Sequence, residues 1–344
     1  MVFRPGAGLL AVALMALPAP FDVAQGRQAP FPPTLDRYLT NSLKLTELER
    51  RTLLSGAPLA NVIDADPARE VAVFGAIWVN APIARYLDAV NDIENFEQGG
   101  GFRVTKKVSE PARVEDFAQL FLPQEDVDDL RKCRVGDCEL KAAAFAIERL
   151  QKEVNWSRGD AKAQVERFLR GLAVEYVNAY RQGGNSELAV YRDRSNPTFV
   201  AREFESLVKS MPEFDQYLTE MKLFLLEYPK PASYPTTSFI YWQEADFGLK
   251  PTIRINHVAI QQSAGGAVVA SKQLYASHYF WTGLELRMLV PDQARGPGFW
   301  FVNVSRSRSD GLSGFLGRVI RGKVRDAARS GVEKGLAAAR KALE

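Results

Sequence analysis

The C-terminal stretch FWFVNVSRSRSDGLSGFLGRVIRGKVRDAARSGVEKGLAAARKALE, residues 299–344, changes from strand-like to helical periodicity. Its first part is rich in aromatic and β-branched residues, which favour a strand. Apolar residues then recur at helical spacing, which predicts a long helix with one face packed on the rest of the protein. The members of that apolar stripe are Leu312, Phe315, Leu316, Val319, Ile320, Ala327, Val332, Leu336 and Leu343.

Several glycines interrupt the predicted helix, although each costs about 1 kcal/mol relative to alanine in a helix interior. One interpretation is that they leave room where the helix covers a cavity or a sheet. The alternative is a tolerant or frayed helix surface. These glycines are Gly314, Gly317, Gly322, Gly331 and Gly335.

Four stretches before the helix have the character of consecutive antiparallel strands separated by short turns that contain glycine or proline. The third of them, residues 266–290, is long and contains one of the two histidines, His278. If this stretch is one continuous strand, alternation places His278 on its apolar face with Phe280 and Leu284. The four predicted strands cover residues 238–248, 252–262, 266–290 and 298–309.

The other histidine, His257, shares a strand face with Ile255 in the preceding stretch. Both histidines are therefore expected on the more apolar side of the sheet, where they could approach each other across neighbouring strands. Three interpretations stay open: hydrogen-bonded core residues, polar groups of an apolar ligand cavity, or chemistry through a metal or proton transfer. Neither H-x-x-x-H nor H-E-x-x-H spacing occurs, so no metal site is predicted.

The N-terminal half supplies a strand, a helix and then a helical block. Residues 69–79 predict a strand, and Asn80 is expected to cap the helix that follows it. Before this strand, Thr46 and Glu49 form the T-x-x-E pattern of a capping box. Residues 140–230 carry mainly helical periodicity. Strands, a helical block, a meander and a terminal helix together predict an α+β protein.

This order of elements resembles the START-like, or helix-grip, superfamily of lipid- and polyketide-binding proteins. The resemblance rests on EVAVFGAIWVNAPIARYLDAV (residues 70–90), as first strand and helix, and on residues 299–344, as last strand and closing helix. It covers about residues 67–110 and 235–344. It implies an antiparallel sheet wrapped on a long C-terminal helix, with residues 140–230 as a helical insertion that departs from the family pattern.

The resemblance implies that the protein binds a lipid or other hydrophobic small molecule, without catalysis, in a cavity between the sheet and the terminal helix. Transfer of apolar surface out of water would contribute about 25 cal/mol per Å² buried. No catalytic residue, cofactor or nucleic-acid partner is predicted. The residues expected to line the cavity are His257, His278, Tyr241, Asn256, Ile255, Phe280, Leu284, Phe315 and Val319.

Two alternative functions stay open. One is a cyclase- or hydrolase-like enzyme on the same scaffold that uses His257 or His278. The other is a membrane-surface interaction module that acts through the basic C-terminal helix. Residues 305–344 carry ten Lys and Arg against four Asp and Glu, whereas the rest of the chain carries 34 against 37. This asymmetry suggests peripheral contact with an anionic membrane.

The N-terminus predicts export. An apolar run from Ala7 to Leu17 follows Arg4, as in a secretory signal peptide, and small residues allow cleavage near Ala19 to Gly26. We therefore expect a periplasmic or secreted protein. Its predicted organisation is a signal peptide (residues 1–26), an N-terminal helical segment (27–66) and a START-like domain (67–344).

The only two cysteines, Cys133 and Cys138, stand on either side of a Gly136-Asp137 turn signal. A loop of this size can bring two α-carbons within disulfide range, and oxidised pairs are typical of exported proteins. A redox pair would usually have C-x-x-C spacing, and a metal site would need two more ligands. The sequence therefore favours a structural disulfide.

Overall fold

The computed structural model describes residues 31–98, 101–246, 250–310 and 314–344, and for residues 314–320 the backbone only. The predicted signal peptide, residues 1–26, lies outside this part of the chain. Within the described residues, one eight-stranded antiparallel sheet has the order β1-β2-β10-β9-β8-β7-β6-β3. Its strands are β1 (Leu59–Val62), β2 (Glu70–Val79), β3 (Phe102–Lys107), β6 (Thr236–Ala245), β7 (Thr252–Ser263), β8 (Gly266–Ala276), β9 (Phe280–Pro291) and β10 (Phe299–Ser309).

The sheet joins the first long strand of the chain to the last one. β2 pairs with β10 along its full length, from Val79 opposite Phe299 to Glu70 opposite Arg308. β10 also pairs with β9, and the remaining strands follow as a meander to β6, which pairs with β3. The predicted α+β class, the predicted first strand and the predicted last strand are thus confirmed.

The prediction of one continuous strand over residues 266–290 is wrong. The chain turns at Ser277–Tyr279, so β8 and β9 are separate strands and the meander contains five strands rather than four. Tyr279 takes a left-handed conformation with φ of 59°, which is rare for a residue other than glycine. His278 therefore lies in a turn at the end of the sheet and not on a strand face.

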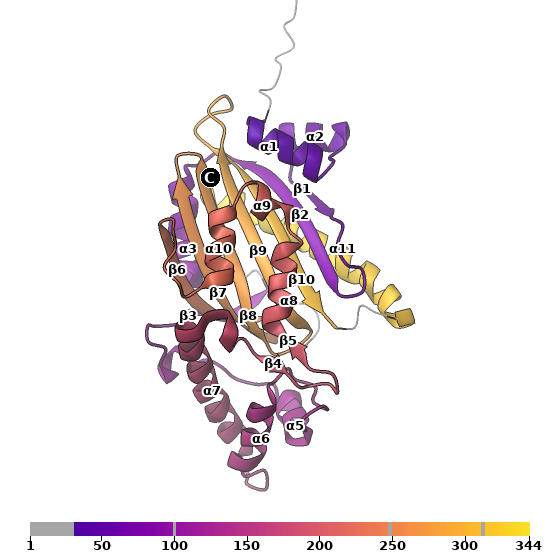
Figure 1. Cartoon of the computed structure of the whole chain (residues 1–344), viewed down its shortest axis with the longest axis vertical. Coiled ribbons are helices and arrows are strands. Elements are labelled where there is room, and N and C mark those ends of the chain that lie inside the picture. The colour runs from indigo at the N-terminus through magenta and orange to yellow at the C-terminus, as the bar shows by residue number, and fades with distance from the viewer. Residues whose placement is uncertain (1–30, 99–100, 247–249, 311–313) are drawn as a thin grey trace, which may run out of the picture.

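One face of the sheet is covered by the helical block (Figure 1). α8 and α10 lie in front of the strands, while α5, α6 and α7 gather at the lower end of the molecule. Apolar residues of α8 and α10, such as Phe204 and Phe224, share one buried cluster with Leu286 of β9 and Val302 of β10. The helices of this block are α5 (Gln124–Lys132), α6 (Ala144–Glu153), α7 (Ala161–Gly183), α8 (Val200–Lys209), α9 (Pro212–Gln216) and α10 (Thr219–Glu227), with the short pair β4 (Val190–Tyr191) and β5 (Thr198–Phe199).

The opposite face is covered by α3 (Ile83–Asn91), α4 (Ile93–Phe96) and the terminal helix α11 (Gly314–Leu343). Val324, Ala328 and Val332 of α11 pack on Val71 and Val73 of β2. Further along α11, a second group of residues joins the cluster that contains Tyr86 of α3 and Phe299 and Phe301 of β10. That group is Leu336, Ala339 and Leu343.

α11 is a long helix as predicted, but the three of its glycines whose surroundings are described do not provide space next to the sheet. A β-carbon added to Gly322, Gly331 or Gly335 would meet no atom within 4 Å, so these residues face open space. The glycine that lets α11 approach the sheet closely belongs to the sheet instead, and it is Gly75 of β2. No helix in the described ranges is long and apolar enough to cross a membrane.

The N-terminal helices pack on the same face as α8 and α10. Leu39 and Leu53 belong to the cluster of Phe204 and Leu286. The capping box is confirmed, because Thr46 accepts from the backbone N–H of Glu49 and the Glu49 carboxylate accepts from that of Thr46. Asn80, however, is not the cap of α3, which begins after Pro82. These helices are α1 (Pro33–Arg37), a π-helical turn (Tyr38–Ser42) and α2 (Glu47–Leu54).

Candidate functional site

The two faces of the sheet separate the predicted cavity residues. His257, Ile255 and Leu284 point to the face covered by the helical block, where Ile255 packs with residues of α7. Tyr241 packs on the other face, with α3 and α11, and Asn256 follows it there because it lies opposite Tyr241 in the β6–β7 ladder. The structure therefore does not bring the nine predicted residues into one site. The side chains of Phe315 and Val319 lie outside the described residues.

His257 is a fully enclosed core residue. The Tyr180 hydroxyl of α7 lies 3.0 Å from its Nδ1, and the Tyr228 ring packs 4.6 Å from its ring centre. Burial, together with the nearby positive charges of Lys272 and Arg181, lowers the pKa of His257 to about 3. His257 is therefore neutral at physiological pH, and its Nδ1 accepts a hydrogen bond from Tyr180.

Lys272 lies opposite His257 in the ladder and points to the same face. Its side chain is completely buried, and its Nζ donates to the Tyr180 hydroxyl at 3.2 Å and to Asn185 Oδ1. Burial holds the pKa of Lys272 well below its usual value. Lys272, Tyr180, His257 and Asn185 form a closed hydrogen-bonded group with no buried polar atom left without a partner. We therefore assign this group to the core.

His278 lies far from His257 in the ladder. Its turn packs on α5, where His278 Nε2 lies 3.2 Å from Asp126 Oδ2, and both side chains are buried. Close to Asp126, Lys250 forms ion pairs with Asp129 and Glu125 at 2.8 and 2.9 Å. These contacts link the end of the sheet to α5. We therefore assign His278 a structural role.

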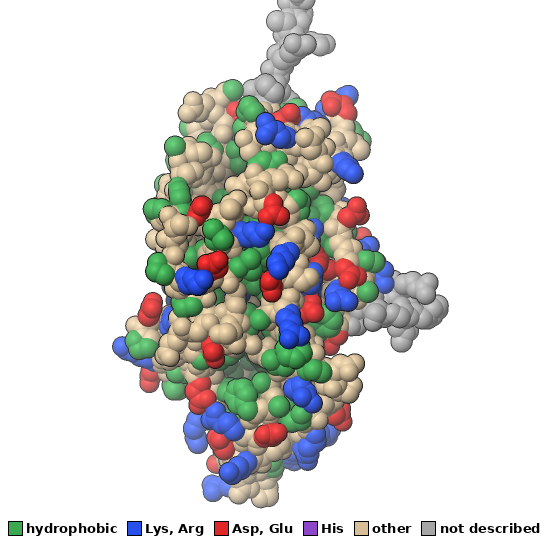
Figure 2. All heavy atoms as spheres, viewed as in Figure 1, with side chains coloured by type: hydrophobic (Ala, Val, Ile, Leu, Met, Phe, Trp, Pro, Cys, Tyr) green, Lys and Arg blue, Asp and Glu red, His purple; other side chains and the backbone are tan. Residues whose placement is uncertain are grey.

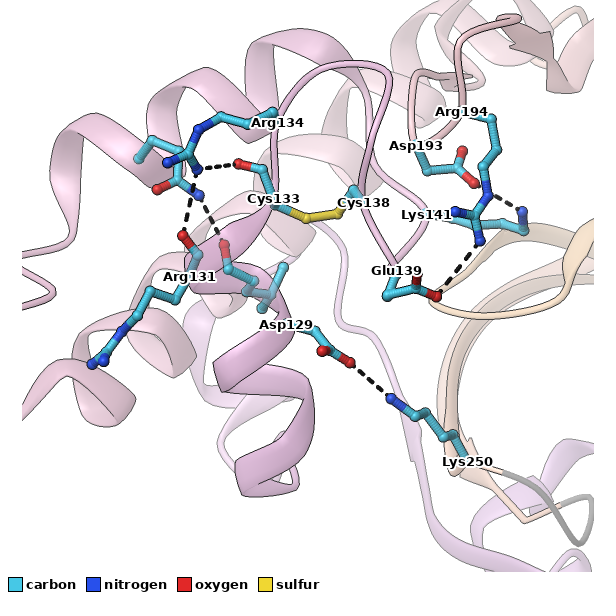
Figure 3. The surroundings of a disulfide bond; sticks show 12 residues. Asp129, Arg131, Cys133, Arg134, Cys138, Glu139, Lys141, Asp193, Arg194 and Lys250 are labelled. Carbon is cyan, nitrogen blue, oxygen red and sulfur yellow. Dashed lines mark hydrogen bonds and ion pairs between the residues drawn. A yellow bond between two sulfur atoms is a disulfide. The ribbon is translucent and has the colours of Figure 1, made fainter.

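The predicted disulfide between Cys133 and Cys138 is confirmed and closes the loop after α5 (Figure 3). Arg134 in this loop donates to the carbonyl of Cys133 at 2.6 Å. On the other side of the loop, Arg194 forms an ion pair with Glu139. The disulfide therefore closes the loop that directly follows α5, the helix on which His278 packs, and α5 lies at the lower end of the molecule.

The face beside α11 carries a different group of polar residues, which we call the polar patch. It is linked by hydrogen bonds: Gln243 donates to Glu97 at 3.4 Å, and Asn256 donates to Gln243 at 3.1 Å. Arg254 donates to Gln273 at 3.2 Å, and Arg287 donates to Glu285 at 2.6 Å. The patch comprises Glu97, Gln243, Arg254, Asn256, Gln273, Glu285 and Arg287.

The register of the strands gathers the patch. Asn256 is the ladder partner of Gln273, and Glu285 lies opposite Ser271, which is two residues before Gln273. The nearest side chain to the missing β-carbon of Gly283 is that of Gln273, at 3.8 Å. Two small residues, Ser271 and Gly283, therefore lie beside the amide of Gln273 on this face.

Two buried atoms of the patch have no hydrogen-bond partner. They are Asn256 Oδ1 and Gln273 Nε2, and the exposed fractions of these two residues are 0% and 2%. An unsatisfied buried polar atom costs about 1–3 kcal/mol, and most buried polar groups are paired. Because the two atoms stand on ladder partners of adjacent strands, the patch is a candidate binding site among the described residues.

The charges of the patch are balanced but perturbed. Burial raises the pKa of Glu97 to about 7, with Arg287 opposing and Glu285 reinforcing that shift. Arg254 also lies close enough to oppose the shift. Glu97 therefore changes its protonation near neutral pH. Glu285 forms an ion pair with Arg287 at 2.6 Å.

Of the polar patch, the sequence predicted only Asn256, together with the neighbouring Tyr241. The residues missed are Glu97, Gln243, Arg254, Gln273, Glu285 and Arg287. The signal available was the alternation Arg254-Asn256 against Ile253-Ile255, which marks a polar face on a central strand. A central strand with one polar face predicts buried hydrogen bonds on that face. Phe280, the last predicted lining residue, is half-buried at the start of β9.

Two of the surface clefts on described residues lie outside the face between the sheet and α11. One, of about 430 Å³, runs along β3 and α4, and the other, of about 390 Å³, lies between Pro58 and the outer flank of α11. On the face covered by α8 and α10, Lys and Arg side chains alternate with Asp and Glu without a single-sign patch (Figure 2). Among the described residues, no three His, Cys, Asp or Glu side chains are arranged to hold a metal ion.

Comparison with known proteins gives no family for this chain. No protein-family model matches it, and no curated protein matches it significantly.

Proposed function

We propose that this protein binds a lipid or other hydrophobic small molecule on the sheet face shared by α3 and α11, with the polar patch holding the polar end of the ligand. The observation that carries the proposal is the pair of buried, unpartnered atoms on Asn256 and Gln273. Ligand sites are mostly apolar surfaces with a few placed polar groups. Tyr241 and Val258 supply apolar surface next to these amides.

The arrangement of the elements supports this proposal. A strand, two helices on one face, a long meander and a terminal helix on that same face form the order expected of a START-like fold. In this proposal the helical block covers the sheet face that would otherwise be exposed to solvent. The ligand lies on the opposite face, which α3 and α11 cover. The disulfide supports an exported, periplasmic or secreted location.

Mass spectrometry of material extracted from the purified full-length protein tests the proposal. We expect one class of amphipathic molecule at close to one equivalent per chain. Ser271→Trp, which would place a large side chain beside Gln273, should abolish copurification of the ligand. Ser263→Trp, at the exposed end of β7, is the matched control and should retain it.

Unchanged copurification in Ser271→Trp would contradict the site. Thermal unfolding of both variants separates loss of binding from loss of folding. If Ser271→Trp does not fold, Gly283→Val, which adds a side chain next to Gln273, provides the second filled variant. An empty wild-type protein that also fails to bind added lipids would contradict the function itself.

A further inference from the structure

The hydrogen bonds of the polar patch fix which way its amides point. Above its pKa, the Glu97 carboxylate can only accept, so Gln243 turns its NH₂ group toward Glu97. Gln243 Oε1 then faces Asn256 and accepts from its NH₂ group at 3.1 Å. The atom left over on Asn256 is Oδ1, which is an acceptor.

The neighbouring glutamine is fixed from the other side. Arg254 has only donors, so Gln273 turns Oε1 toward Arg254 Nε. Gln273 Nε2 is therefore left without a partner, and it is a donor. One free acceptor and one free donor thus stand on ladder partners of adjacent strands.

The patch offers no net charge to a ligand. Glu285 is neutralised by Arg287 at 2.6 Å, and Glu97 and Arg254 contribute one further negative and one further positive group. A carboxylate head would leave Asn256 Oδ1 facing another acceptor. An ammonium head would leave Gln273 Nε2 facing another donor.

We infer that the polar end of the ligand is an uncharged group that both donates and accepts, such as a hydroxyl or a primary amide. The inference rests on the proposed function and specifies its ligand class. A single hydroxyl group can donate to Asn256 Oδ1 and accept from Gln273 Nε2. Sites built to hydrogen-bond a particular group discriminate strongly against analogues that leave buried partners unpaired.

The test uses three probes with the same twelve-carbon chain and different heads: monolauroylglycerol, laurate and dodecylammonium. Isothermal titration of the full-length protein at pH 8, above the pKa of Glu97, measures each dissociation constant. We expect monolauroylglycerol to bind at least about tenfold more tightly than either ion, because each ion leaves one buried atom unpaired. Tighter or equal binding of laurate or dodecylammonium would overturn the inference and leave the proposed function standing.

Two variants tie the preference to the residues. Gln273→Met keeps the length of the side chain and removes the donor, so the preference for monolauroylglycerol should fall at least severalfold. Gln261→Met, at the far end of β7, is the matched control and should preserve it. An unchanged preference in Gln273→Met would overturn the assignment. If no probe binds the wild type and no lipid copurifies, the proposed function and the inference fail together.

Discussion

Gly75 of β2 lies directly beneath Val332 of α11. A β-carbon on Gly75 would come within 2.5 Å of Val332 Cγ1 and 2.8 Å of Leu336 Cδ1, distances that real side chains do not show. The terminal helix therefore sits closer to the sheet than any other residue at position 75 would permit. The last residue of the chain adds to this docking, because the Glu344 carboxylate accepts from the backbone N–H of Asn80 at 2.8 Å.

Gly75→Ala should loosen α11. Overpacking a tight contact costs about 1–3 kcal/mol of unfolding free energy, and here the strain falls on one helix. We expect a lower melting temperature and faster amide exchange in residues 321–343. Gly331→Ala, on the open side of the same helix, is the matched control and should stabilise the protein by up to about 1 kcal/mol. Equal effects of the two substitutions would contradict the described packing.

Lys272→Met should raise stability. In the folded protein burial lowers the pKa of Lys272, whereas the unfolded chain keeps it near 10.5. Between the lowered pKa and 10.5 the unfolded state binds the extra proton, so wild-type stability increases with pH in that range. The substitution removes this slope. Urea unfolding at several pH values above neutrality measures both effects, and parallel pH profiles of the two proteins would contradict them.

His257 should make the protein sensitive to acid. Its pKa falls from 6.5 to about 3 on folding, so the unfolded state binds the extra proton between these values. Stability should therefore decrease as the pH falls from 6.5 toward 3, by up to about 1.4 kcal/mol per pH unit. His257→Gln should flatten this part of the profile. Urea unfolding from pH 7 to pH 4 provides the measurement, and an unchanged slope would argue against the neutral buried histidine.

Glu70→Gln should be strongly destabilising. The Glu70 carboxylate is buried and accepts from Arg306 at 2.9 Å and from Arg308 at 3.0 Å. Removal of one partner from a buried ion pair typically costs about 3–5 kcal/mol, because the remaining charge is uncompensated. Glu47→Gln, which breaks an exposed pair with Arg51, should cost less than about 1 kcal/mol. Chemical denaturation of both variants compares the two effects.

Loss of the disulfide should have a moderate and local effect. Closing a loop as short as that between Cys133 and Cys138 contributes about 2 kcal/mol in the chain-entropy model. The double substitution to serine should lower stability by this amount and increase amide exchange in α5 and in the turn around His278. A reducing agent should lower the unfolding free energy of the wild type and leave that of the double variant unchanged. Exchange changes in α11 instead would contradict a local role.

Elements with strong local signals could be predicted from the sequence. β2 is a run of β-branched and aromatic residues, α11 has a clear apolar stripe, and the cysteines have a turn signal between them. The turn between β8 and β9 could not be predicted, because Ser277–Tyr279 contains no glycine or proline. The chain reverses there through the left-handed Tyr279, whose hydroxyl accepts from the backbone N–H of the distant Lys250 at 2.9 Å.

The candidate site was only partly predictable for a related reason. Periodicity separates the two faces of a strand, but it does not say which helices cover each face. The apolar face that bears His257 was expected beneath α11, whereas the helical block covers it. In addition, the β7–β8 register shifts between Ile255 and Asn256. Ile255 pairs with Tyr275 and Asn256 with Gln273, so Leu274 has no partner in β7. Such irregularities depend on tertiary contacts.

The pairing of β2 with β10 has a consequence for how the chain acquires its fold. The two strands are about 230 residues apart in the chain, yet they are hydrogen-bonded neighbours, second and third from one edge of the sheet. Until Phe299–Ser309 has emerged during synthesis, one edge of β2 has no partner strand. Val71 and Val73, which α11 later covers, stay exposed to water. Such high contact order favours slow folding, so β2 is expected to acquire its full set of strand partners late.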